Sequence, residues 1–104
     1  MELESKEYSW KWITADELLC KTPCEICHVL LTCKGANCRV EIYDGEDTSG
    51  KYIARVEALA NRSVSIDIHH HIYCERGLYL DLYEDTVNGV LVQWLEVPQG
   101  IGHP

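Results

Sequence analysis

The sequence has few basic residues for its acidity. Nine Lys and Arg stand against 17 Asp and Glu in 104 residues, so the formal net charge is −8. This charge repels phosphate backbones and anionic lipid headgroups, so we expect neither nucleic acid nor a membrane as a partner. Apolar runs such as 29–31 and 90–92 are also far shorter than the roughly 20 residues of a membrane-spanning helix.

Patterns of catalysis and export are missing as well. No Gly-rich phosphate loop, Ser/His/Asp set or carboxylate pair stands out in the sequence, so an enzyme is not indicated. The opening residues MELESKE are acidic, whereas a signal peptide starts with basic residues and continues with an apolar run. We therefore expect synthesis in a cytoplasm without a signal peptide.

Alternating apolar and polar residues are present along most of the chain. Extended runs at 26–33, 38–43, 52–57, 64–68, 78–83 and 90–97 are separated by turn residues, among them Asn88-Gly89, a tight-turn signal. Short strands at this spacing are typical of two packed sheets. We predict an all-β, single-domain antiparallel β-sandwich. The residues expected inside it are Val40, Ile42, Val64, Ile66, Leu80, Leu82, Val92 and Trp94.

A segment rich in aromatic residues precedes these runs. Tyr8, Trp10 and Trp12 alternate on one side of an extended arm, and Thr14 and Glu17 have the spacing of a capping box, which predicts one short helical turn. We divide the chain into three parts: an N-terminal arm and turn (1–17), the sandwich (18–98) and a loose C-terminal tail (99–104).

The arm has little of its own domain to cover. Aromatic residues are enriched at subunit contacts, and an extended arm can add to the sheet edge of a neighbour. We therefore predict a homo-oligomer in which Tyr8, Trp10 and Trp12 contact another subunit. The alternative is that the arm folds back as an edge strand on its own sandwich.

Six cysteines are many for a reducing cytoplasm, where disulfides are rare. They are Cys20, Cys24, Cys27, Cys33, Cys38 and Cys74. Three explanations are open: metal ligation, disulfides formed after release from the cell, and small buried apolar side chains.

Two cofactor sites are conceivable in the cysteine-rich segment. Cys24-Glu25-Ile26-Cys27-His28 has the attachment pattern of c-type haem, but Cys27 and His28 would face opposite sides of a strand. The spacing between the later cysteines is loose for zinc, so we favour neither site and expect no cofactor. The candidate zinc ligands are Cys20, Cys24, Cys27, His28, Cys33 and Cys38.

Cys33 and Cys38 flank residues 34–37, which we interpret as a hairpin loop. Where a hairpin closes, facing residues lie within the roughly 5.5 Å between Cα atoms that a disulfide accepts. This pair is our candidate disulfide, and two reduced thiols are the alternative. The sequence does not pair Cys20, Cys24, Cys27 and Cys74.

Three consecutive histidines occupy positions 69–71. Imidazole binds transition metals, but alternation places only His69 and His71 on one face of a strand. A pair that faces solvent or another subunit is therefore favoured over a metal site. We add His69 and His71 to the predicted oligomer contacts, where a pH-sensitive contact is also open.

Three segments resemble a known family. VEIYDGEDTSGK (40–51), RGLYLD (76–81) and VLVQW (90–94) are similar to motifs of small β-sandwich proteins encoded among the virion genes of tailed bacteriophages. The resemblance covers residues 18–97. It implies a jelly-roll-like fold, no catalytic residues, and a role in capsid decoration, a head fibre or a tail. The cysteines of 20–38 depart from the family pattern, which leaves redox or metal stabilisation as a local addition.

We therefore expect a non-enzymatic structural virion module of a tailed bacteriophage, made in the host cytoplasm. Its expected partners are further copies of itself and other virion proteins. A small zinc- or haem-bearing protein is the chief alternative. A carbohydrate-binding sandwich is a third hypothesis, in which Tyr8, Trp10, Trp12, Tyr79 and Tyr83 would form a stacking platform.

Overall fold

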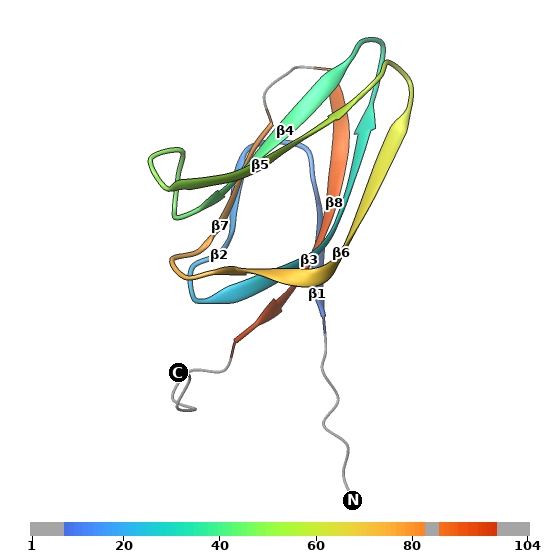
Figure 1. Ribbon diagram of the computed structural model, residues 1–104. Coiled ribbons are helices and arrows are strands. Elements are labelled where there is room, and N and C mark those ends of the chain that lie inside the picture. The colour runs from blue at the N-terminus through green and yellow to red at the C-terminus, as the bar shows by residue number, and fades with distance from the viewer. Residues whose placement is uncertain (1–7, 83–85, 98–104) are drawn as a thin grey trace, which may run out of the picture.

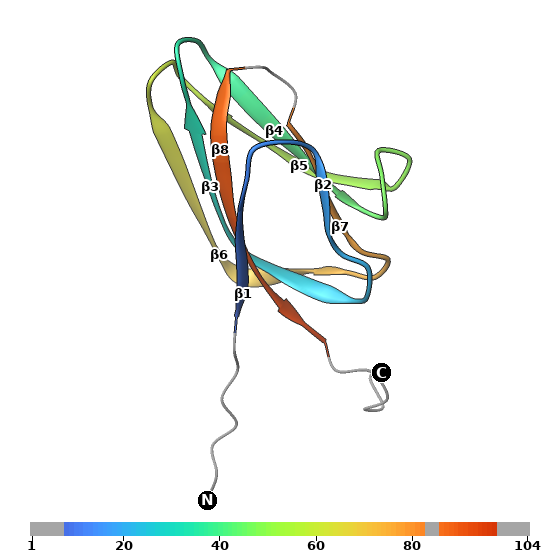
Figure 2. The ribbon, with the colours of Figure 1, turned by 180° about the vertical axis from the view of Figure 1, so that it is seen from behind.

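Two four-stranded antiparallel sheets face each other in the computed structural model, which describes residues 8–82 and 86–97 (Figures 1 and 2). The strands are β1 (Ser9–Ile13), β2 (Glu17–Cys20), β3 (Cys24–Cys33), β4 (Cys38–Asp44), β5 (Lys51–Ala58), β6 (Ser63–Cys74), β7 (Leu78–Leu82) and β8 (Val87–Glu96). The predicted all-β sandwich is confirmed. The described residues form no helix, and so contain none that is long and apolar enough to cross a membrane.

The strands of each sheet come from distant parts of the chain. Sheet I has the order β1-β8-β3-β6, and sheet II has the order β2-β7-β4-β5. Only β4 and β5 follow each other within one sheet, and every other connection crosses between the sheets. Most strand neighbours therefore cannot be identified from their positions in the sequence.

The core lies between the inner faces of the two sheets. Strand β3 alternates between buried and partly exposed residues, as expected for a strand with one face against a core. Of the predicted core residues, Val40, Ile42, Leu80, Val92 and Trp94 are buried, and Val64 and Leu82 pack partly buried against them.

Ile66 was expected in the core, and this prediction is wrong because its side chain is 39% exposed. Its register partner Val29 is buried, so Ile66 lies on the inner side of sheet I. However, β6 is an edge strand, with a neighbour on one side only. Alternation therefore gave the correct face, but it could not show that this face is uncovered at the edge.

The aromatic arm forms an edge strand of its own sandwich. Residues of β1 pair antiparallel with β8, from Ser9 opposite Trp94 to Ile13 opposite Val90. Ile13 is only 2% exposed. In the single chain, the sandwich therefore begins at Ser9, ahead of the expected boundary at residue 18.

Two local signals were overridden by strand pairing. The expected helical turn at Thr14–Glu17 is absent among the described residues, because Glu17 begins β2 opposite Leu80. Asn88 and Gly89 form no tight turn, because both lie inside β8, where the register shifts against β3. The pairing of each segment with a distant strand determined its conformation.

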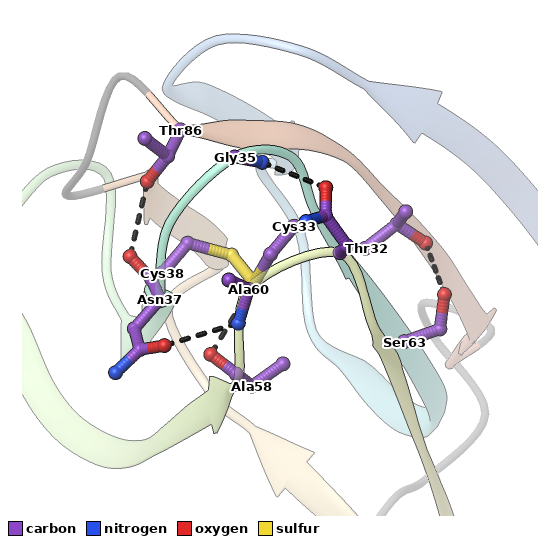
Figure 3. The surroundings of a disulfide bond; sticks show 10 residues. Thr32, Cys33, Gly35, Asn37, Cys38, Ala58, Ala60, Ser63 and Thr86 are labelled. Carbon is purple, nitrogen blue, oxygen red and sulfur yellow. Dashed lines mark hydrogen bonds between the residues drawn. A yellow bond between two sulfur atoms is a disulfide. The ribbon is translucent and has the colours of Figure 1, made fainter.

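Cys33 and Cys38 form the expected disulfide, with 5.6 Å between their Cα atoms, but the expected hairpin is wrong. Strand β3 belongs to sheet I and β4 to sheet II, so residues 34–37 cross between the sheets. The bridge therefore links the two sheets at one end. Figure 3 shows Asn37 beside it, where its side-chain oxygen accepts a 3.0 Å hydrogen bond from the Ala60 N–H and its carbonyl accepts one from Thr86.

Candidate functional site

A β-bulge interrupts β3 at Cys27. Trp94 and Gln93 are consecutive on β8, yet their partners Ile26 and His28 are separated by Cys27. On the other side of β3, Ile26 pairs with Ile72 and His28 with Asp67, so the single residue Cys27 lies opposite residues 68–71 of β6. Bulges of this kind bend a strand and redirect its side chains, and they are common beside functional sites.

A pocket of about 260 Å³ lies at this bulge. Its walls come from β3, β6, β8 and the residue preceding β1. We call it the bulge site, and its lining residues are Tyr8, Cys27, His28, Asp67, His71 and Gln93.

Two histidines connect β3 and β6 around the bulge site. Nε2 of His28 lies 2.9 Å from Oγ of Ser65, and Nδ1 of His71 lies 3.1 Å from Oε1 of Glu25. The ring of His71 also lies edge-on to that of Tyr8, at 6.2 Å between centroids. The site thus combines hydrogen-bonding groups with one aromatic wall.

Ser65, His28 and Asp67 have the residue types of a hydrolase triad. However, Oδ1 of Asp67 lies 3.7 Å from Nδ1 of His28, beyond hydrogen-bond distance, and the Asp67 side chain is 86% exposed. In a working triad the carboxylate is buried and hydrogen-bonded to the histidine that it orients. The geometry therefore indicates a polar network between strands rather than an activated serine.

The thiol of Cys27 is unsuited to nucleophilic chemistry. Burial, followed by the nearby carboxylate of Glu25, raises its pKa from 9.0 to about 11. The reactive species of a cysteine is the thiolate, and this thiol stays protonated near neutral pH. Cys27 therefore fills space at the bulge.

An exposed row of aromatic side chains adjoins the bulge site. Tyr8, Trp10 and Trp12 are 47%, 65% and 43% exposed. Trp10 and Trp12 are paired with Gln93 and Leu91 of β8. The residues of β8 that alternate with these two point into the core and are buried: Val90, Val92 and Trp94. The row therefore lies on the outer face of sheet I. We call these three residues the aromatic stripe, and Tyr8 is common to the stripe and the bulge site.

The candidate zinc ligands are distributed over three places. Cys33 and Cys38 are bonded to each other, Cys27 and His28 lie at the bulge, and Cys20 and Cys24 lie in the core. Within residues 8–82 and 86–97, no three His, Cys, Asp or Glu side chains are grouped to hold a metal ion. The haem pattern is divided as well, because Cys24 belongs to the core cluster and Cys27 does not.

Other predicted site residues are also separated. His71 contacts Glu25 and Tyr8, whereas the ring of His69 lies 4.7 Å from that of His70. Tyr79 lies in sheet II, so it cannot share a stacking platform with the aromatic stripe, and Tyr83 lies outside the described residues.

Sequence reasoning did not identify Asp67 and Gln93 at the bulge site, Ser65 beside His28, or Cys74 beside Cys24. The register of β3 with β6 and β8 brings these residues together, and no short-range motif in the sequence indicates that register. Comparison of the chain with known protein families, curated proteins and solved structures finds no match.

Proposed function

We propose that this chain is a non-enzymatic structural module that associates with a second copy of itself through β1. The observation that carries the proposal is the aromatic stripe, in which Trp10 is 65% exposed on an edge strand. The free side of an edge strand presents unpaired backbone groups that can pair with another chain. Exposed Trp and Tyr side chains are typical of interface centres.

Charge favours β1 over the other edges. Two copies of a chain with net charge −8 repel each other, so their contact needs a surface with few carboxylates. Of the four edge strands that the structure describes, β2, β5 and β6 contain Glu17, Glu57 and Asp67, respectively. Strand β1 contains no acidic residue, and its one basic residue, Lys11, is ion-paired with Glu17 of β2, so the carboxylate nearest to β1 is neutralised.

We place this module in the virion of a tailed bacteriophage, as a decoration, head-fibre or tail component beside other virion proteins. The resemblance of residues 40–51, 76–81 and 90–94 supports this role. The eight strands, which alternate almost regularly between two sheets, support the jelly-roll-like connectivity that the resemblance implies.

Sedimentation velocity with a matched pair of variants tests the association. Trp10→Glu and Leu59→Glu each add one negative charge at similarly exposed positions, 65% and 62%. We expect the wild-type chain and Leu59→Glu to sediment as dimers or larger assemblies, and Trp10→Glu as a monomer. A monomeric wild-type chain at about 100 μM, or an unchanged assembly of Trp10→Glu, would contradict the proposal.

Carbohydrate binding is a second candidate, and the position of Tyr8 favours it. Tyr8 joins the aromatic stripe to the hydrogen-bonding groups of the bulge site, and sugars are bound by such combinations of stacking and polar contacts. In this case, Asp67→Ala would abolish binding of a neutral oligosaccharide in titration calorimetry and leave the sedimentation unchanged. No heat of binding across a panel of such sugars would rule this function out.

A further inference from the structure

Three thiols lie together in the core, at the end of β3 opposite the Cys33–Cys38 bridge. Cys24 begins β3, Cys74 ends β6 and Cys20 ends β2. All three belong to the core cluster, and Cys24 and Cys74 are completely buried. The proposed association does not involve them, and none of them lines the bulge site.

Cys24 and Cys74 are direct partners in the antiparallel register of β3 and β6. Residues opposite each other in such a pair point to the same face, with Cβ atoms about 4.5–5.5 Å apart. Their Cα atoms are then within the 4.4–6.8 Å that a disulfide spans, and a small approach brings the Cβ atoms to the roughly 3.5–4.5 Å that it needs. In agreement with this register, a hydrogen bond with Cys74, together with burial, raises the pKa of the Cys24 thiol.

Cys20 is the competing partner, because its thiol is also hydrogen-bonded to that of Cys24. However, Sγ of Cys20 donates to the carbonyl oxygen of Thr22 at 3.4 Å and lies 3.5 Å from Oγ1 of Thr22. Cys20 also lies in sheet II, without a register partnership to Cys24. The geometry therefore favours Cys74.

We propose that Cys24 and Cys74 form a second disulfide, which joins β3 to the edge strand β6 when the chain folds in the presence of a small-molecule disulfide such as oxidised glutathione. One protein thiolate attacks the oxidant and releases one glutathione thiolate. The second protein thiolate attacks the resulting mixed disulfide and releases another. The protein loses two electrons and two protons, and one glutathione disulfide becomes two glutathione molecules.

The two bridges would differ in how much they stabilise the folded state. Cys33–Cys38 closes a segment of sequence separation 5, whereas Cys24–Cys74 closes a loop of about 50 residues, and longer loops give larger stabilisation. We expect the second bridge to raise the melting temperature by about 10 °C or more.

Peptide mapping of the full-length wild-type chain tests the pairing directly. The protein is refolded with reduced and oxidised glutathione, its free thiols are alkylated at low pH, and it is cleaved with trypsin and a glutamate-specific protease. Cleavage after Lys21, Glu25 and Glu75 separates Cys24 from Cys20 and Cys27. We expect peptide 22–25 linked to peptide 63–75, and alkylated Cys20 and Cys27.

The other outcomes overturn the proposal. They are any disulfide that involves Cys20 or Cys27, such as a link between peptides 22–25 and 18–21, and alkylation of all four remaining cysteines. Cys27→Ser is the matched control, since it removes a buried thiol outside the core cluster. This variant should keep the cross-link and the gain in melting temperature, whereas Cys74→Ser should lose both. Failure here leaves the sedimentation result for β1 unaffected, so the two proposals are tested separately.

Discussion

The two faces of sheet I differ although the same strands build them. On the inner face, Ile26, Val29 and Leu31 of β3 are at most 1% exposed. On the outer face, Trp10 and Trp12 are 65% and 43% exposed, beside the histidine contacts of the bulge site. Alternation within one strand thus separates the side chains that hold the fold together from those available to a partner.

This difference predicts unequal effects for two adjacent leucines of β3. Leu31 is completely buried, and Leu30 is partly exposed on the opposite face. We expect Leu31→Ala to lower the free energy of unfolding by about 2–5 kcal/mol, because it leaves a cavity, and Leu30→Ala to cost about 1 kcal/mol or less. Urea denaturation measures both values. Equal losses would mean that the outer face is as important for stability as the core.

A smaller effect is expected where Trp12 covers β8. A Cβ atom added at Gly89 would overlap the indole ring of Trp12. We expect Gly89→Ala to displace this ring and to cost about 1–3 kcal/mol, with a red shift of the tryptophan emission. In the Trp12→Ala background the same substitution should cost almost nothing. A similar cost in both backgrounds would show that the backbone of β8, rather than the ring, resists the change.

The smallest effect concerns Cys27, which is buried outside the core cluster. Its pKa is raised in the folded state, so the unfolded chain loses the thiol proton first as the pH rises. The stability from this thiol is complete below about pH 9 and is lost as the pH rises through about 11. We expect the melting temperature of Cys27→Ser to fall a few degrees less over this range than that of the wild type. Parallel curves would contradict this.

The sequence was sufficient for the sandwich because alternation depends only on local spacing. It was not sufficient for sheet membership. Cys33 and Cys38 were paired correctly through an incorrect hairpin, because a short connection brings its ends together whether it turns within one sheet or crosses to the other. Asn88-Gly89 was misread because a bulge and a tight turn favour the same residues.

The candidate site was less accessible to sequence reasoning. The aromatic stripe was visible as an alternating pattern, but the bulge site depends on one extra residue, Cys27, between two distant pairings. Cys24 and Cys74 likewise meet only through the register of β3 and β6. Long-range register is determined by the packing of the whole sandwich, and a single sequence does not encode it in a short motif.

The interior place of β8 in sheet I has a consequence for the order of events during synthesis. β8 is the last strand that the structure describes, yet it lies between β1 and β3. At roughly 5–20 residues per second, residues 87–96 leave the ribosome about 4–15 s or more after β1. During this interval β1 has no partner strand, and its tryptophans are accessible to chaperones before they become part of a finished surface.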